Sequence, residues 1–346
     1  MAYISFQPSD YYSTNLYTGT ASEQVFTDIG FGPALVWLKG RNATEKHIWT
    51  DTVRGATKTL SCSTNSAQST DAQYLTAFSS TGFTVGTSNE TNQSGINFAS
   101  RSWKAGTTSG LSGGTITPTA YSFNATSGFG MYAYAGTSAA GTIAHGLGTA
   151  PECVIVKKFS AADSWWVYHQ GTGAGKYMVL DTTAAPVTNS AAWNDSAPTD
   201  TLIHLGTAGN TNSSSGSPTY IMYAFAPVKG FSSFGKYYGN NNDDGPFIYT
   251  GFRPAFLMVK QSNDVGDWLI MDDKRVGYNP DNNYFKANAT SASQGAANKC
   301  DILSNGFKPR SSGAGHDLNG ASDTYNYMAF AEFPMVSSNS KAGTAR

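Results

Sequence analysis

Carboxylates are the side chains of this 346-residue chain that could do acid–base chemistry. Glycoside hydrolases need two carboxyl groups about 5–9 Å apart. The chain has five glutamates, and no two of them lie within twenty residues of each other: Glu23, Glu45, Glu90, Glu152 and Glu332. The adjacent acidic pairs at 243–244 and 272–273 are aspartates, and neighbours on a strand point to opposite faces. The sequence therefore predicts no catalytic carboxylate pair.

Histidine and cysteine give no metal-binding pattern. The chain contains no HxH, HExxH or CxxC sequence, and Cys62, Cys153 and Cys300 lie far apart. We therefore expect no enzyme activity, no cofactor, no metal centre and no disulfide framework, with folding in a reducing compartment. The segment 240–245 is interpreted as a tight turn. A calcium-binding turn through Asp243 and Asp244 is the alternative.

Binding is the chemistry that remains. Exposed aromatic rings can stack on sugars while Asn and Asp side chains hydrogen-bond the hydroxyl groups. Trp49, Trp165 and Trp268 are predicted to be core residues because they recur in a repeat and large aromatic residues are mostly buried. The candidate ligand-binding residues begin with Trp166, which follows Trp165 directly. The others are Trp193 with Asn194 and Asp195, and Tyr278 with Asn282, which lie in polar segments.

The elements that would position these residues recur three times along the chain. An apolar segment begins with proline and ends with lysine six residues later, at 33–39, 151–157 and 254–260. A Tyr-x-Gly precedes each lysine by 22 or 23 residues, at Tyr17, Tyr134 and Tyr237, and a tryptophan follows it by eight or ten. This agreement predicts a threefold internal duplication. Proline at the first position suits the start of a strand, and the apolar run predicts burial on both faces. The lysine is expected to place its charge where the strand leaves the core.

The fold class expected is all-β, with three tandem, internally duplicated antiparallel β-sandwich modules of lectin-like or jelly-roll-like type. The predicted modules are residues 1–106, 107–227 and 228–346. Residues 105–119 have the composition of a linker. The short junction at 227–236 carries Phe231 and Phe234 and predicts rigid packing, and a polar tail follows residue 335. No amphipathic helix of ten residues or more is expected.

Composition excludes two classes of partner. The net charge is −1 and charged residues make up 13%, against roughly 25% in an average protein. Such a surface has no long-range attraction for phosphate backbones, so nucleic acid is not expected as a partner. No apolar run reaches membrane-spanning length, and the first residues do not resemble a secretion signal.

Several motifs resemble a family common in phages of marine bacteria. They are GFRPAF at 251–256, IAHGLG at 143–148, WKAG at 103–106, GFK at 306–308 and MAFAEFP at 328–334. Members of that family are labelled tail-fibre-like or virion structural proteins with lectin-like β-sandwich modules. The resemblance implies a place in the virion after assembly in the host cytoplasm. The implied partners are other virion proteins, further copies of the chain with a trimer favoured, and a host surface glycan or protein. A decoration or cement protein is the alternative, and a depolymerase comes third.

Overall fold

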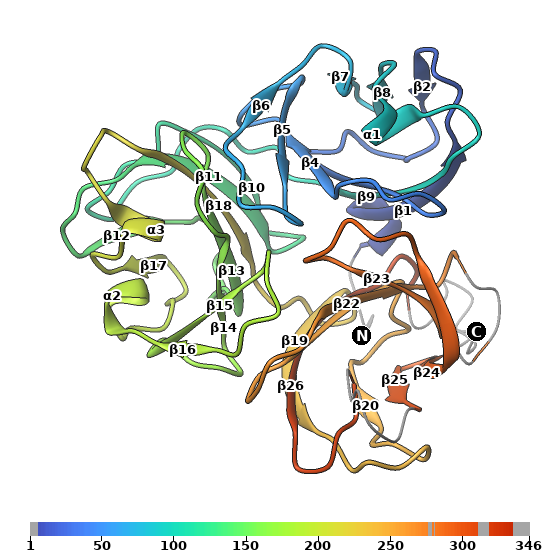
Figure 1. Ribbon diagram of the computed structural model, residues 1–346. Coiled ribbons are helices and arrows are strands. Elements are labelled where there is room, and N and C mark those ends of the chain that lie inside the picture. Colours follow the sequence, from blue (N-terminus) through green and yellow to red (C-terminus); the bar gives the residue numbers. More distant parts are fainter. Residues whose placement is uncertain (1–5, 276–278, 280, 311–317, 335–346) are drawn as a thin grey trace.

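The protein is almost entirely β-structure in the residues that the computed structural model describes, which are 6–275, 279, 281–310 and 318–334 (Figure 1). The helices of this part are one 3-10 turn and three helices of four residues: η1 (Pro8–Asp10), α1 (Asn89–Asn92), α2 (Ser190–Trp193) and α3 (Gly209–Asn212). None of these helices could cross a membrane. The predicted all-β, antiparallel fold class is confirmed. The predicted polar tail lies outside the described residues.

Module 1, the chain up to residue 106, is a sandwich of two sheets. The large sheet has the strand order β1-β9-β3-β4-β5-β6 and the small sheet has the order β2-β8-β7. The strands are β1 (Tyr12–Thr18), β2 (Gln24–Phe26), β3 (Leu35–Gly40), β4 (Ile48–Asp51), β5 (Lys58–Ser61), β6 (Ser69–Thr70), β7 (Leu75–Phe78), β8 (Phe83–Val85) and β9 (Asn97–Trp103).

Module 2, residues 107–227, has the same plan. Its large sheet runs β10-β11-β18-β13-β14-β15-β16, and a hairpin-like pair, β12 and β17, covers one face. The strands are β10 (Ala120–Asn124), β11 (Phe129–Ala135), β12 (Gly141–Ala144), β13 (Cys153–Lys158), β14 (Trp166–His169), β15 (Lys176–Val179), β16 (Val187–Thr188), β17 (Leu202–Leu205) and β18 (Thr219–Phe225).

Module 3, from residue 228, has one sheet that curls over itself. The order is β19-β26-β21-β22-β23-β24-β25-β20, and side chains of β20 and β25 share a core with those of β21 and β22. The strands are β19 (Ser232–Tyr238), β20 (Ile248–Tyr249), β21 (Phe256–Gln261), β22 (Trp268–Asp272), β23 (Asp281–Lys286), β24 (Gln294–Leu303), β25 (Gly306–Pro309) and β26 (Thr324–Phe330).

The middle strands of each large sheet are buried on both faces. In β3, Leu35 and Trp37 point into a central core that all three modules share, whereas Val36 and Leu38 point into the core of module 1. Strands β13 and β21 divide their side chains in the same way. The three large sheets accordingly face the middle of the molecule (Figure 1). The repeated apolar strands are therefore buried on both faces because one face packs against the neighbouring modules.

Three aromatic rings, one from each module, meet at the centre of this shared core. Trp103, Phe225 and Phe330 end the equivalent strands β9, β18 and β26. Their ring centroids lie 6.3, 5.7 and 5.8 Å apart, and each pair meets edge-on. Edge-to-face packing is a favoured arrangement of aromatic pairs. The three modules thus close around a triangle of rings.

Hydrogen bonds between modules recur at equivalent positions. Trp165 Nε1 of module 2 donates to the carbonyl oxygen of Ser61 in module 1 at 2.9 Å. Trp268 Nε1 of module 3 donates to the carbonyl oxygen of Val179 in module 2 at 2.8 Å. Both acceptors lie in the strand that follows β4 or β14 in its sheet. Each bond gives a buried indole N–H its acceptor in the neighbouring module.

The predicted repeat register of the tryptophans is wrong in module 1. The strand pairing places His47, not Trp49, at the position of Trp165 and Trp268. The His47 ring lies edge-on to Phe285 of module 3, with centroids 5.8 Å apart. All three tryptophans are nevertheless buried, as the sequence predicted.

The lysines that end the repeated strands are not at the surface. The sequence predicted a charge leaving the core, yet Lys39, Lys157 and Lys260 are fully buried. Their ammonium groups donate to backbone carbonyls, and two of them reach another module: Lys39 to Thr290 at 3.2 Å and Lys157 to Asn65 at 2.9 Å. Burial lowers the pKa of each lysine to about 8. Lys39 and Lys157 thus connect modules, whereas Lys260 donates to carbonyl groups of its own module.

Most of the predicted linker lies along module 2 as a segment that we call the strap (residues 107–119). Thr107 pairs with Phe123 of β10, and the amides of Thr115 and Ile116 donate to the carbonyl of Thr142 in β12. Ile116 is buried in the core of module 2. The strap therefore lies on module 2, as the predicted boundary at residue 107 has it, and its backbone hydrogen bonds hold it there. The second junction does pack rigidly, since Phe231 and Phe234 are buried in the central core.

A candidate ligand pocket in the second module

The two tryptophans proposed as ligand-binding residues are buried. Trp193 is 1% exposed, and its Nε1 donates to the carbonyl oxygen of Lys176 at 3.1 Å. Trp166 points away from the central core, as strand alternation predicted, but the core of module 2 covers it. Its ring stacks on Tyr177 with centroids 3.6 Å apart. Neither ring is free to stack on a sugar, so these two predictions are corrected.

The polar candidates do not form one site. Asn194 and Asp195 are exposed, and both have positive φ, at 55° and 47°, in the turn after α2. Tyr278 lies outside the described residues. Asn282 lies in β23 of another module, and its side chain is not described. No described contact joins these residues.

The segment proposed as a turn or a calcium site forms a turn. Asn240 and Asn242 side chains accept hydrogen bonds from backbone amides two residues further on. The Asp244 carboxylate pairs with Lys308 and lies 3.7 Å from Arg310 Nη1. The carboxylate thus faces cationic side chains, which is unfavourable for a cation site. Among the described residues, no cluster of three His, Cys, Asp or Glu could hold a metal ion.

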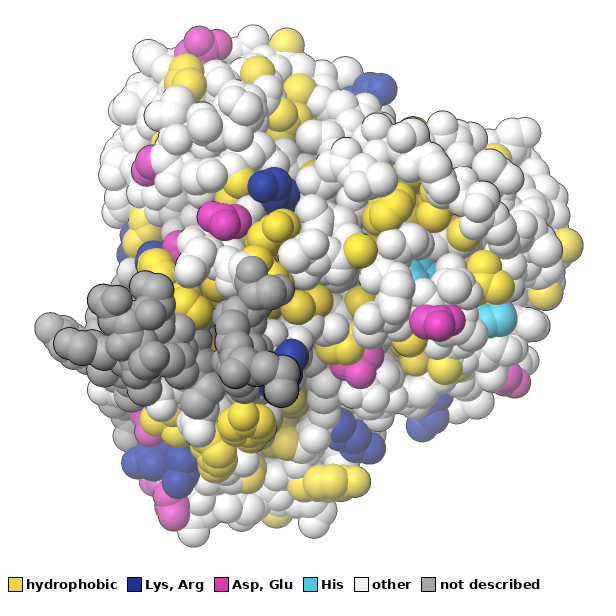
Figure 2. Space-filling model, turned by 180° about the vertical axis from the view of Figure 1, so that it is seen from behind, with side chains coloured by type: hydrophobic (Ala, Val, Ile, Leu, Met, Phe, Trp, Pro, Cys, Tyr) yellow, Lys and Arg dark blue, Asp and Glu magenta, His cyan; other side chains and the backbone are white. Residues whose placement is uncertain are grey.

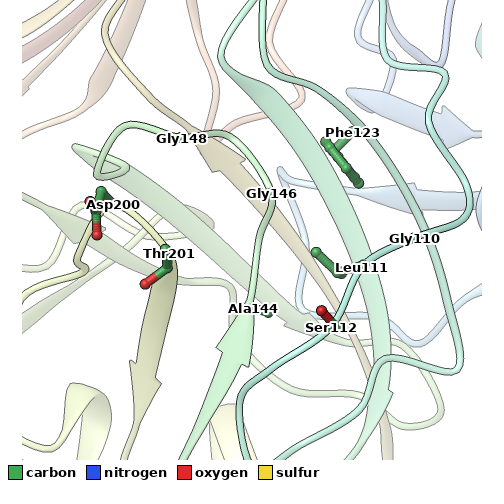
Figure 3. A pocket seen from close by; sticks show the side chains of 9 residues that line it. All are labelled: Gly110, Leu111, Ser112, Phe123, Ala144, Gly146, Gly148, Asp200 and Thr201. Carbon is green, nitrogen blue, oxygen red and sulfur yellow. The ribbon is translucent and has the colours of Figure 1, made fainter.

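A pocket of about 270 Å³ lies in module 2, between the strap and two loops (Figure 3). One loop follows β12 and the other precedes β17. The lining residues are Gly110, Leu111, Ser112, Phe123, Ala144, Gly146, Gly148, Asp200 and Thr201. This volume lies just below the range of about 300–1,000 Å³ for small-molecule sites, so the pocket suits only a small ligand.

The strap and the β12 loop approach closely because glycines occupy the contacts. Gly114 has φ 76°, and a Cβ there would lie 2.6 Å from the carbonyl oxygen of Thr142. Gly146 has φ 68°, and a Cβ there would lie 2.6 Å from Phe123 Cζ. Any larger residue would push the strap or the Phe123 ring away. These glycines hold the pocket walls in place.

His145 lies between the lining residues Ala144 and Gly146 and joins the two loops. Its Nδ1 accepts a hydrogen bond from the amide of Leu147 at 3.1 Å, so Nε2 carries the proton and donates to the carbonyl of Thr199 at 3.1 Å. Burial lowers the pKa of His145. The imidazole is therefore neutral near pH 7 and joins the β12 loop to the loop before β17.

Ser112 lies in the sequence Gly-Leu-Ser-Gly-Gly at 110–114, which fits the GxSxG pattern of hydrolase nucleophiles. That pattern requires a turn from a strand into a helix, whereas residues 110–114 run along the strap. Both nitrogens of His145, the nearest histidine in sequence, are bonded to backbone groups. His145 is therefore not placed as a base for Ser112. The GxSxG pattern therefore lies at the pocket, but the geometry around Ser112 is not that of a hydrolase.

The lining groups suit a polar ring. The Asp200 carboxylate is exposed and makes no hydrogen bond or ion pair within the described part of the chain. Thr201 and Ser112 add hydroxyl groups, and Leu111 and Phe123 add apolar surface. Sequence reasoning missed these residues because they come from three separate segments. The glycines of the strap and of the IAHGLG motif were the available signal.

Two carboxyl groups that are distant in sequence do meet in module 1. Glu45 lies in the loop after β3 and shares a side-chain hydrogen bond with Glu90 of α1. Lys46 Nζ lies 2.9 Å from Glu90 Oε1. The sequence gave no sign of this pair. A direct hydrogen bond leaves no space for a substrate, and glycoside hydrolases need about 5–9 Å between the two groups.

We expect Glu45→Gln to stabilise the protein at about pH 8. Burial and the hydrogen bond with Glu90 raise the pKa of Glu45 from 4.5 to about 7. Between these values the folded protein holds a proton that the unfolded chain has released. The proton on Glu45 therefore contributes its full stabilisation of the folded state below the unfolded pKa of 4.5, and this contribution is lost as the pH rises towards the folded pKa of about 7. Thermal unfolding across this range should show a flatter profile for the variant, and identical pH slopes would contradict the expectation.

One family model matches the chain, over residues 7–334, and its description is a domain of unknown function. No curated protein and no solved structure matches the chain. The matched range includes all three modules and every residue of the pocket.

Proposed function

The chain belongs to the DUF7483 family of domains of unknown function, and we propose that it is a structural protein of a phage virion. Its role is that of a tail-fibre or tail-appendage component that contributes to attachment to the host surface. The observation that carries the attachment role is the pocket of module 2, which an unpaired carboxylate, two hydroxyl groups and apolar side chains line. The virion location rests on the resemblance of the repeat motifs.

The architecture supports a rigid structural role. The three modules share one core, and the three cysteines are buried and free, so the fold needs no disulfide. Charged side chains are few and scattered on the face shown in Figure 2. Partners under this proposal are other virion proteins and a host glycan. A trimer of chains stays a prediction. The aromatic triangle joins the three modules of one chain and does not involve further copies.

Asp200→Asn is expected to weaken binding of the purified chain to host-surface glycans by about tenfold or more, since hydrogen bonds to a charged acceptor are strong. A glycan array, followed by titration of the best ligand, measures the loss. Asp195→Asn is the matched control: it makes the same exchange in the same module, outside the pocket. If Asp195→Asn weakened binding and Asp200→Asn did not, the pocket assignment would be wrong.

Location is tested separately by cryo-electron microscopy of the assembled particle. Density for this chain at the tail periphery, with the pocket of module 2 facing outward, is the expected result. Density tiled on the capsid would overturn the attachment role and favour a decoration protein.

A further inference from the structure

We propose that the pocket of module 2 takes a neutral or amino-substituted sugar ring and rejects sugars that carry a carboxylate or sulfate. This inference rests on the proposed attachment function and specifies the ligand class of the same site.

The pocket lining carries a negative charge. Asp200 is the only charged residue among the nine that line the pocket. An ionised carboxylate is a hydrogen-bond acceptor without a donor. It can accept from sugar hydroxyl groups or from an ammonium group, but it repels a second anion. A site of this kind discriminates by an unfavourable like-charge contact as much as by attraction.

His145, which lies between the lining residues Ala144 and Gly146, does not offset the negative charge of Asp200. The hydrogen bonds of His145 leave one proton on the ring, and both nitrogens are engaged by backbone groups. The imidazole therefore stays neutral and supplies no cation to a bound carboxylate. The lining contains no lysine or arginine. A uronic or sialic acid would bring a charge into the pocket with no counter-ion.

The shape of the pocket supports a pyranose-like ring. Leu111 and Phe123 lie on one side of the pocket, and Asp200 and Thr201 lie on the other, with the Ala144 to Gly148 loop between them (Figure 3). A sugar has an apolar C–H face and a rim of hydroxyl groups, so it can satisfy both sides at once.

The experiment compares matched sugars by titration and by saturation-transfer NMR with the full chain. The methyl glycosides of glucose, glucosamine and glucuronic acid differ in one substituent each. We expect glucuronide to bind about tenfold or more weakly than glucoside, and glucosaminide to bind at least as well as glucoside. Asp200→Asn should reduce the difference in affinity between the glucoside and the glucuronide, and Asp195→Asn should leave this difference unchanged.

Each outcome bears on one of the two proposals. A glucuronide that binds as well as the glucoside would overturn the ligand class and leave the attachment role standing. An unchanged difference in Asp200→Asn would also overturn it. Host cells that bind the chain while no neutral or amino sugar does would overturn the ligand class alone. Absence of binding to both host cells and sugars would overturn the attachment role itself.

Discussion

Replacing Asp272 by alanine is expected to lower the free energy of unfolding by about 3–5 kcal/mol, because it leaves buried guanidinium groups without a counter-ion. Asp272 Oδ2 accepts from Arg101 Nη2 at 2.7 Å and from Arg275 Nε at 2.6 Å. All three side chains are at most 1% exposed. Arg101 belongs to module 1 and the other two belong to module 3, so the loss would also loosen a module boundary.

Urea unfolding at pH 7 measures this loss, with Asp195→Asn as an exposed control that keeps a residue type suited to the positive φ there and should change stability by less than about 0.5 kcal/mol. Arg101→Met is a milder companion, because Asp272 keeps its bond to Arg275. The strand register also places methionine, Met328, at the equivalent position of module 3. A loss below about 1 kcal/mol in Asp272→Ala would contradict the argument that the buried cations need this carboxylate.

The same ion triad predicts sensitivity to acid. Burial alone would raise the pKa of Asp272, but Arg275 and Arg101 beside it hold the pKa well below its usual range. A depressed carboxyl pKa contributes stability that is present above the unfolded value of about 3.9 and is lost as pH falls towards the folded value. The difference in the free energy of unfolding between the native protein and Asp272→Ala should therefore be constant from pH 7 to about pH 4 and should become smaller below that.

The strands could be predicted from the sequence because the apolar segments repeat with constant spacing. The same spacing would have corrected the register of module 1: His47 follows Lys39 by eight residues, just as Trp165 follows Lys157. Side-chain type suggested Trp49 instead. Position in the ladder, not chemical likeness, decides which residues are equivalent, and a two-residue offset leaves Trp49 and His47 on the same face of the sheet.

The packing of the modules was harder to predict. A strand that is apolar on both faces shows that something covers each face, but not whether the cover is a sheet of the same module or another module. The terminal lysines looked like solvent contacts because a charge is rarely buried without partners. Their partners are carbonyl groups of loops such as the one at Thr290, which sequence spacing does not relate to Lys39.

The pocket could not be predicted for a similar reason. Its walls come from the strap, from the loop after β12 and from the loop before β17. Gly110 and Asp200 are brought together only by the fold. Trp193, by contrast, stood in a polar segment that favoured exposure, but helix α2 places its ring in the core of module 2.

Phe330→Ala is expected to lower the free energy of unfolding by about 3–5 kcal/mol, and to do so for the whole chain at once. The Phe330 ring lies within 6 Å, centroid to centroid, of Trp103 in module 1 and Phe225 in module 2. A cavity here would remove contacts from all three modules. Because each large sheet depends on the other two to cover its inner face, no module should stay folded when the centre is lost.

Phe333→Ala is the matched control, since Phe333 lies three residues later and is 52% exposed. Its loss should cost less than about 0.5 kcal/mol. Tryptophan fluorescence and far-ultraviolet circular dichroism should report one coincident transition in the native protein and in Phe330→Ala, at a lower midpoint in the variant. Separate transitions, or a variant that shifts only one of them, would show that the modules fold independently. A single shifted transition would instead mean that the chain behaves as one cooperative unit around the aromatic triangle.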